Sequence, residues 1–155
     1  MAFTNSNDYI TGRKSVPTPM CVENVSVRYT LDLATGDLAL NTIGQVGILP
    51  AGYVPVEVVV DATDMDSSTA AMVLQVGIWD GSDTALSTAT ADGGAHWGVT
   101  TATNAAFRQY LTPNGRGLAT VTASTSDRKL GVKVTAAPTT AVAGTLGVTL
   151  TYRAP

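Results

Sequence analysis

The sequence predicts an all-β protein: an antiparallel, jelly-roll-like β-sandwich that follows an extended N-terminal arm. Three observations lead to this prediction. Apolar and polar residues alternate along several short segments, turn-forming residues separate those segments, and strong helix formers are scarce. Charged residues make up 14% of the 155 residues, against about 25% in an average protein. Thr, Val, Ala and Gly take their place, and a composition rich in β-branched residues favours strands.

Five segments carry apolar stripes with a period of two, which a strand directs to one face. In chain order the stripes are Val25-Val27-Tyr29-Leu31-Leu33, Val54-Val56-Val58-Val60, Met72-Leu74-Val76-Ile78, Leu130-Val132-Val134 and Leu146-Val148-Leu150-Tyr152. The sequences LATGDL, LPAGYVP, DGSD, PNGRG and APTTAVAG fall at the breaks and contain typical turn residues. Many short strands joined by turns are typical of antiparallel sandwiches.

Two regions depart from this pattern. Residues 1–21 have no stripe and contain Pro17 and Pro19, so we expect an extended arm there. We expect residues 22–155 to form a single β-sandwich domain. Residues 83–111 mix small, polar and aromatic residues, and we expect a short helix around Ala105 to Leu111 within long loops.

Composition argues against several classes of partner. The net charge is −3 and no run of Lys and Arg occurs, so we expect no nucleic-acid partner. No apolar run approaches the roughly 20 residues of a membrane-spanning helix, so we expect no membrane partner. The single cysteine, Cys21, allows no internal disulfide, and the N-terminus lacks the apolar segment of a secretory signal. We therefore expect synthesis in the cytoplasm.

Asp61, Asp64 and Asp66 lie close together after the second stripe. Calcium is bound by several carboxylate and carbonyl oxygens, and a sandwich loop can supply them together with its neighbours. The segment DATDMDSS, however, lacks the Gly and the distant Glu of an EF-hand loop. Asp and Ser also end strands by forming turns. We predict a structural turn without a metal, and calcium binding is the alternative.

The residues form no recognisable catalytic constellation. His96 is the only histidine, and no serine lies in the context of a nucleophile elbow. One histidine and one cysteine cannot build a typical zinc site. We therefore expect a protein that is not an enzyme and that needs no cofactor.

Aromatic residues suggest a further alternative. Trp79, Trp97, Phe107 and Tyr110 could form a platform that stacks on sugars, but packing in the core or at an interface is our preferred interpretation. The alternation places Trp79 and Val59 on the faces opposite their stripes, which suggests a second buried surface such as an oligomer interface. We list Trp79 and Trp97 among the candidate partner-binding residues.

We expect the N-terminal arm to lie across a neighbouring subunit. The residues expected to make its contacts are the apolar Phe3, Tyr9 and Ile10 and the basic Arg13 and Lys14. Polar, proline-containing termini rarely fold alone. We therefore expect the β-sandwich to fold without residues 1–14.

The order of the motifs resembles a pattern in small structural proteins of tailed phages. In the segment ILPAGYVPVEVVVDATDMDSSTAAMVLQVGIWDGSDTALST, an LPAG turn leads into a valine-rich strand, an acidic turn follows, and the next strand ends in VGI before a DG turn. The C-terminal segment DRKLGVKVTAAPTTAVAGTLGVTLTYRAP is similar as well. Over residues 25–155 the sequence thus resembles the capsid decoration, or cement, proteins of tailed bacteriophages.

This resemblance implies a function and partners. Proteins of this kind are β-sandwich subunits that sit as trimers on the phage head. The expected partners are the major capsid protein and further copies of the chain, in a homotrimer. The expected role is to stabilise the head from the capsid exterior of the virion, at three-fold or quasi-three-fold positions, through many weak contacts that trimeric avidity multiplies. The alternative is a carbohydrate-binding, host-attachment module of the virion.

Overall fold

The structure is a computed structural model, and it describes residues 2–19, 23–69, 71–82, 84–101, 104–113 and 117–155. The strands in chain order are β1 (Val25–Leu33), β2 (Ile43–Leu49), β3 (Val54–Ala62), β4 (Val73–Ile78), β5 (Gly98–Val99), β6 (Phe107–Tyr110), β7 (Thr112–Pro113), β8 (Arg128–Ala136) and β9 (Gly144–Arg153). Short 3₁₀ helices are η1 (Thr35–Leu38), η2 (Thr90–Asp92) and η3 (Leu118–Thr120).

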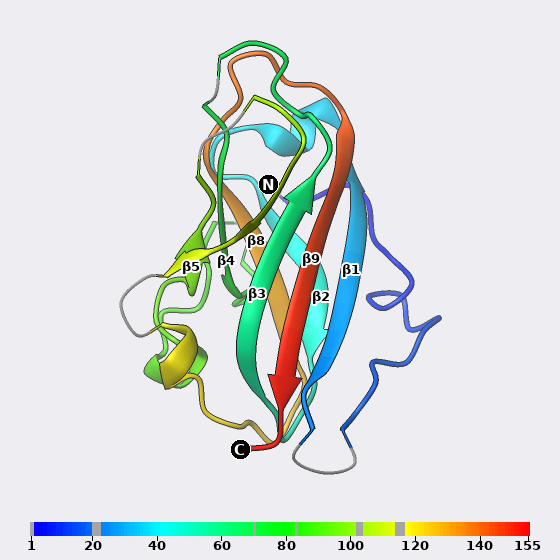
Figure 1. Ribbon diagram of the computed structural model, residues 1–155, viewed down its shortest axis with the longest axis vertical. Helices are drawn as coiled ribbons and strands as arrows, with labels where there is room; N and C mark the ends of the chain where they lie inside the picture. Colours follow the sequence, from blue (N-terminus) through cyan, green and yellow to red (C-terminus); the bar gives the residue numbers. More distant parts are fainter. Residues whose placement is uncertain (1, 20–22, 70, 83, 102–103, 114–116) are drawn as a thin grey trace.

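Two sheets pack face to face (Figure 1). One sheet has four strands in the order β1-β9-β3-β6, and the other has five in the order β2-β8-β4-β5-β7. The strand pairs within both sheets are antiparallel. This architecture confirms the predicted all-β antiparallel sandwich. In the part of the chain that the structure describes, no helix has the length and apolarity needed to cross a membrane.

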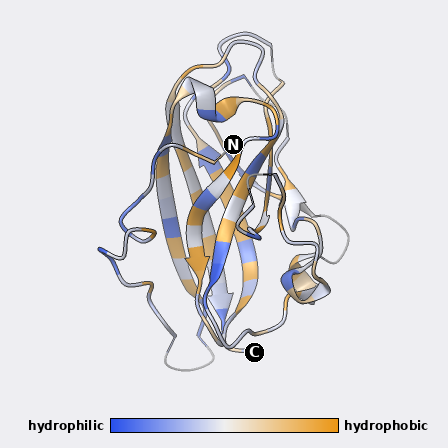
Figure 2. Ribbon diagram, turned by 180° about the vertical axis from the view of Figure 1, so that it is seen from behind, coloured by the Kyte–Doolittle hydropathy of each residue, from blue (hydrophilic) through white to orange (hydrophobic). Residues whose placement is uncertain are grey.

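The alternation of side chains builds the core between the sheets. In β1 every second residue from Val27 to Leu33 is buried, and the residues between them are exposed. Figure 2 shows hydrophobic and hydrophilic positions alternating along the strands. The stripes predicted for β4, β8 and β9 are buried too, and Leu74, Val132 and Val148 have no exposed surface. Because burying one Val or Leu side chain contributes about 1.5–3 kcal/mol, this core is the main source of stability.

The stripe predicted over residues 54–60 is wrong at Val56. The pairing of β3 with β9 shifts register between Pro55 and Glu57, which is a β-bulge. Val56 consequently has 41% of its surface exposed, whereas Val58 and Val60 point into the core. Proline cannot donate to the hydrogen-bond ladder and is tolerated at bulges, so Pro55 accounts for the irregularity.

The helix expected around Ala105 to Leu111 is also wrong, because Phe107–Tyr110 form strand β6. Along β6 half-buried and exposed residues alternate, which is the period of a strand. The strand pairs with β3 and places Tyr110 opposite Val59. Val59 is only 4% exposed within the single chain, so its burial needs no second subunit, contrary to our expectation.

Both flanks of the sandwich are covered. On one flank the chain crosses between the sheets, since β6 belongs to the four-stranded sheet and β7 to the five-stranded one. On the opposite flank the N-terminal arm lies beside the edge strand β1, and its described residues, 2–19, form neither strand nor helix (Figure 1). Cys21 and the predicted boundary between residues 21 and 22 lie outside the described residues.

Candidate interaction surface

The N-terminal arm is fixed to the sandwich at its start by Asp37 of η1. Asp37 is buried, and its carboxylate accepts hydrogen bonds from the N–H and the hydroxyl of Thr4 at 3.0 and 2.9 Å. The same carboxylate accepts a hydrogen bond from the N–H of Ala34 at 3.0 Å. Burying a carboxylate costs free energy unless its oxygens are hydrogen-bonded, so Thr4 and Asp37 hold each other in place.

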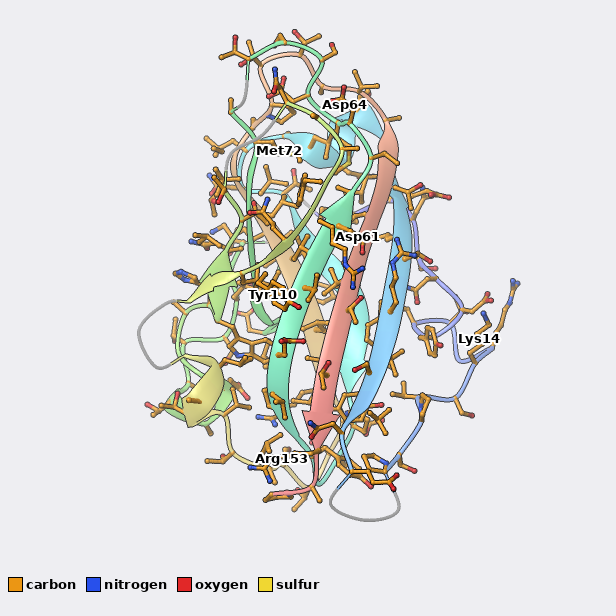
Figure 3. The ribbon with its side chains drawn as sticks, in the orientation of Figure 1. Lys14, Asp61, Asp64, Met72, Tyr110 and Arg153 are labelled. Carbon is orange, nitrogen blue, oxygen red and sulfur yellow. The ribbon has the colours of Figure 1, made fainter. Side chains whose placement is uncertain are left out.

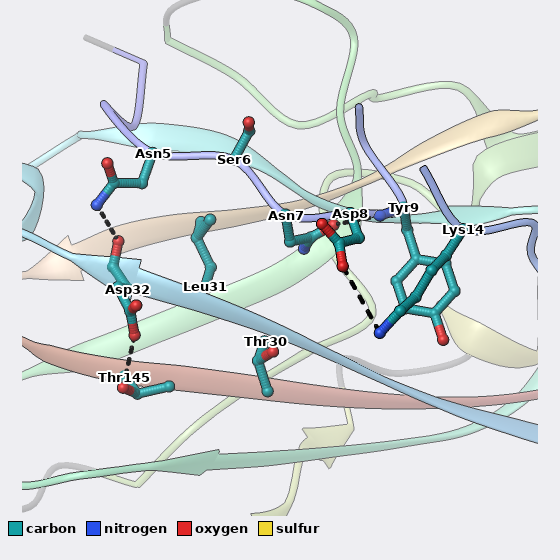
Figure 4. A pocket seen from close by; sticks show the side chains of 10 residues that line it. All are labelled: Asn5, Ser6, Asn7, Asp8, Tyr9, Lys14, Thr30, Leu31, Asp32 and Thr145. Carbon is teal, nitrogen blue, oxygen red and sulfur yellow. Dashed lines mark hydrogen bonds and ion pairs between the residues drawn. The ribbon is translucent and has the colours of Figure 1, made fainter. Parts of the chain in front are cut away.

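Two asparagines of the arm then bind the edge strands of the two sheets. The side-chain amide of Asn5 donates to the carbonyl of Asp32 in β1 at 2.7 Å (Figure 4). The side-chain amide of Asn7 donates to the carbonyl of Val46 in β2 at 2.8 Å. Because edge strands leave backbone groups unpaired, these bonds cover part of both edges. A mainly polar groove of about 550 Å³ remains between the arm and β1.

Two aromatic rings, Phe3 near the start of the arm and Tyr9 in its middle, pack against the sandwich. Phe3 lies directly on Gly44 of β2, where a Cβ would stand 2.6 Å from Cδ2 of the phenyl ring. Tyr9 packs edge-on against Tyr29 of β1, with ring centroids 5.0 Å apart and an interplanar angle of 82°. Tyr29 is buried and donates its hydroxyl to the carbonyl of Ile48, and burial raises the pKa of this phenol well above its ordinary value. Both rings therefore find their contacts within their own chain.

The end of the arm is held by two tyrosines of the sandwich. The hydroxyl of Tyr152 donates to the carbonyl of Pro17, and that of Tyr53 donates to the carbonyl of Pro19 at 2.9 Å. Burial raises the pKa of Tyr152 to about 12, so its hydroxyl is a protonated donor at neutral pH. The arm is packed along its length, and we now expect removal of residues 1–14 to destabilise the sandwich.

Arg13 and Lys14 lie at an outward turn of the arm, and we call these two residues the basic turn. Figure 3 shows Lys14 projecting from the flank of the molecule. The Arg13 and Lys14 side chains are 78% and 61% exposed, and both pair loosely with Asp8 at 3.9 and 3.7 Å. Exposed ion pairs of this kind contribute little to stability, so both cations remain available to a partner.

Trp79 joins the arm in forming one surface. The indole is half-buried directly after β4, it donates its N–H to the carbonyl of Ser82, and the ammonium of Lys129 lies 5.2 Å from its ring centroid. Together with Phe3 and Ile10 of the arm, Trp79 lines a hollow of about 170 Å³. We call the surface around Phe3, Ile10 and Trp79 the arm face.

Trp97 lies in the core instead. Its side chain is only 2% exposed, and its indole N–H donates to the carbonyl of Asp92 at 2.7 Å. This confirms the interpretation as core packing, and it leaves too little of the ring exposed to stack on a sugar. The neighbouring His96 is half-buried, and burial lowers the pKa of its imidazole.

The three aspartates interact with different residues of the chain. Asp61 lies within β3 and forms an ion pair with Arg28 of β1, across the intervening strand β9. Asp64 is exposed and accepts a hydrogen bond from the N–H of Asp66 at 3.1 Å. Within the described residues, no group of three or more His, Cys, Asp or Glu side chains is placed to hold a metal ion.

Asp66 organises the turn. Its buried carboxylate accepts hydrogen bonds from Ser68 and Ala71 in its own loop and from the N–H groups of Thr139 and Thr140 in the loop between β8 and β9. Burial alone would raise the pKa of Asp66, but the backbone N–H donors outweigh it and hold the pKa below its ordinary value of 3.8. The hydrogen bonds of Asp66 agree with the predicted structural turn and join two loops, whereas Asp61 lies within strand β3 and is not part of that turn.

The depressed pKa of Asp66 predicts a loss of stability in acid. Because the folded pKa lies below the unfolded one, the stabilisation is complete above about pH 4 and is lost as the pH falls through the folded value. Asp66→Asn should lower the melting temperature at pH 7 by several degrees and flatten the acid limb of the stability profile. Asp64→Asn, on the exposed neighbour, is the matched control. Added calcium should leave the wild-type melting temperature unchanged, and a rise would contradict the turn interpretation.

A second surface, which the sequence analysis did not predict, lies on the flank opposite the arm. Val56, Tyr110, Leu111 and Leu118 line a groove of about 250 Å³ beside β3 and β6, and we call it the apolar groove. Val56 and Tyr110 are 41% and 68% exposed. Buried Trp97 forms part of its floor, and the exposed Glu57 also lines it.

The fold is similar to that of chains in two phage capsids. A chain in the capsid of Ralstonia phage GP4 matches with a TM-score of 0.74 and 24% sequence identity, over 97% of this chain and 97% of that chain. A chain in the capsid asymmetric unit of cyanophage Pam1 matches with a TM-score of 0.55 and 19% identity, over 92% of each chain. At these identities the likeness establishes a shared fold. No protein-family model and no curated protein matches the sequence.

The sequence suggested Phe3 and Tyr9 as contacts with a neighbouring subunit, whereas the structure places both rings against β2 and β1 of their own chain, on residues that were not predicted. Gly44 carried a signal, because a glycine inside a strand often marks the close approach of another group. Pro55 likewise could have indicated the bulge that exposes Val56. Asp37 lies in the turn sequence ATGD, and nothing local distinguishes it from an ordinary turn residue.

Proposed function

We propose that the chain is a non-enzymatic structural protein of a tailed-phage virion that decorates the capsid exterior. In this proposal it binds the lattice of the major capsid protein as a homotrimer, at three-fold or quasi-three-fold positions, and stabilises the head. The observation that supports this most is the likeness of its fold, over 97% of both chains, to a chain in the capsid of Ralstonia phage GP4.

The physical character of the chain supports the same role. A subunit that reinforces a shell must resist local unfolding and must not pair its own sheet edges with those of other molecules. Here the arm covers part of the edges of β1 and β2, and the crossing from β6 to β7 covers the other flank. The arm is therefore hydrogen-bonded to both sheets, and part of the backbone at their edges is shielded from pairing with other molecules.

Within this proposal the arm face contacts the capsid. Phe3 and Tyr9 hold the arm against the sandwich, so Ile10 and Trp79 are the partly exposed apolar groups that the arm face offers to a partner. Partly buried aromatic residues surrounded by polar ones are typical of interface hot spots. The low charge of the chain also favours contacts that depend on shape and apolar area.

The test is to add the purified protein to heads assembled without it and to reconstruct the particles. We expect three copies at each three-fold or quasi-three-fold position and a higher temperature for release of the packaged DNA. Ile10→Asp should weaken binding to the heads about tenfold or more, because it places a charge in the hollow beside Trp79. Val142→Asp, at an exposed apolar residue outside that hollow, is the control.

A small number of copies at the tail would contradict this proposal and favour the host-attachment alternative. The burial of Trp97 removes one of the two tryptophans on which sugar stacking would depend, so we do not propose that alternative.

A further inference from the structure

The apolar groove leaves hydrophobic surface without a partner in the single chain. The large hydrophobic side chains that are exposed in the described part of the chain are Leu40, Val56, Tyr110 and Val142, and two of these four line the groove. Exposed apolar side chains that gather around a concave site mark interaction surfaces more often than isolated ones do. The groove around Val56 and Tyr110 is therefore the candidate site for a binding partner.

Both neighbouring strands, β3 and β6, contribute an exposed apolar side chain to the groove. The bulge at Pro55 turns Val56 out of the core, although it belongs by sequence to the apolar stripe of β3. Tyr110 ends β6 on the outer face of the sheet, where it lies opposite Val59. The exposed Glu57 at the same site adds a negative charge to an otherwise apolar lining.

The opposite flank presents the complementary charge. β1 and β6 are the two edges of the four-stranded sheet, and the basic turn lies on the β1 side while the groove lies on the β6 side. Figure 3 shows Lys14 and Tyr110 on different sides of the molecule, with Lys14 projecting outward. Long Lys and Arg side chains combine an apolar stem with a charged end, which suits an apolar groove that carries a carboxylate.

We propose that the basic turn of one copy docks into the apolar groove of the next copy. The stems of Arg13 and Lys14 cover Val56 and Tyr110, one cation meets Glu57, and the other lies over the Tyr110 ring. Because the two surfaces lie on opposite edges of one chain, the contact is heterologous and closes into a ring when the rotation between copies fits. The proposal rests on the homotrimer of the proposed function and names its interface.

Charge complementarity favours a second copy as the occupant over the capsid shell. The groove carries the acidic Glu57. Within its own chain the basic turn has two long ion pairs with Asp8, at 3.9 and 3.7 Å, and the Lys14 ammonium lies 5.8 Å from the centroid of the Tyr9 ring, so both cations remain exposed for a second contact. Contacts between opposite charges also guide encounter and fix the relative orientation of two copies.

Disulfide trapping tests this geometry directly. In a Cys21→Ser background, Lys14→Cys combined with Val56→Cys should form disulfides between copies, which denaturing gels would show as covalent dimers and trimers. The two positions lie on opposite flanks, so a disulfide within one chain would exceed the Cα separation that such bonds allow. Lys14→Cys with Leu40→Cys is the control, because Leu40 is 59% exposed but lies outside the groove.

The trapping is carried out on concentrated protein and on decorated heads. Cross-linking of the Val56 pair in either sample, without cross-linking of the Leu40 pair, supports the proposal. No cross-linking in both samples, or equal cross-linking of the two pairs, overturns it. Protein that cross-links in solution but does not bind heads would contradict the proposed capsid function while leaving this interface in place.

A charge swap provides an independent readout. Glu57→Lys should lower the association constant of the protein about tenfold, and so should Arg13→Glu with Lys14→Glu. All three side chains are exposed, so these substitutions should leave folding intact. The triple variant, which exchanges the charges across the interface, should regain association. If the single-surface variants associate like the wild type, or if the triple variant is as weak as either of them, the contact is not the one proposed.

Discussion

Gly93→Ala should be among the most destabilising single substitutions in the chain, with a loss of about 2–5 kcal/mol. Gly93 has a φ of +92°, and a Cβ there would stand 2.3 Å from the carbonyl oxygen of Gly117 and 2.8 Å from the Trp97 ring. The backbone of Gly117 cannot move as a flexible side chain can. We therefore expect the segment around η2 to separate from that around η3, and the floor of the apolar groove to loosen with it.

Gly94→Ala is the matched control for this prediction. Gly94 also has a positive φ, +80°, but a Cβ there would meet no atom within 4 Å. Gly94→Ala should therefore lower the free energy of unfolding by about 1–2 kcal/mol, the strain of an alanine in the left-handed conformation. Chemical denaturation of both variants measures the difference, which isolates the steric contribution. Equal losses in the two variants would show that strain alone, and not the contact with Gly117 and Trp97, limits this position.

The same region is held by a partly buried ion pair. Arg128 at the start of β8 donates to the carboxylate of Asp92 at 3.0 Å, and it also donates to the carbonyls of Ala91 and Thr122. Ser87 donates its hydroxyl to the other oxygen of Asp92 at 2.6 Å. These bonds fix a long connection that has little regular structure, and they explain how Trp97 is held in the core by a loop.

The regular strands could be predicted from the sequence because their signal is local. In β1 and β9 the apolar residues that recur at every second position are also those that pack between the sheets. The period of two in the sequence is therefore sufficient to predict these strands and their buried faces. The prediction failed at Val56 because a bulge shifts this period by one residue, and a bulge is set by the pairing with β9. It failed at residues 107–110 because a short strand is fixed by its partner β3 more than by its own composition.

The candidate surfaces depend almost entirely on contacts between residues far apart in the chain. Thr4 meets Asp37, Tyr9 meets Tyr29, and the arm ends against Tyr152, which lies at the opposite end of the sequence. Phe3 and Tyr9 could be chosen as anchors because they are apolar residues in a polar arm. The surface that they bind could not be predicted from the sequence, because it depends on how η1 and the edges of β1 and β2 come together.

Docking of the arm should depend on the absence of a side chain at Gly44. Gly44→Ala is expected to cost about 1–3 kcal/mol, because the new methyl group would stand 2.6 Å from the Phe3 ring and must displace it. Phe3→Ala should cost about 2 kcal/mol, since its ring is only partly buried against the core. In the double variant the methyl group occupies space that the ring has left, so the two losses should not add.

A double-mutant cycle therefore decides whether this contact holds the arm. We expect the double variant to be more stable than the sum of the single losses predicts, with a coupling of about 1 kcal/mol or more. Hydrogen exchange should localise the effect, because the N–H of Thr4 is protected only while it is bound to Asp37. In Gly44→Ala this amide should exchange faster while the buried strand β8 keeps its protection. If the losses in unfolding free energy add, or if the N–H of Thr4 stays protected in Gly44→Ala, the arm is held by its hydrogen bonds and not by the packing of Phe3 against Gly44 of β2.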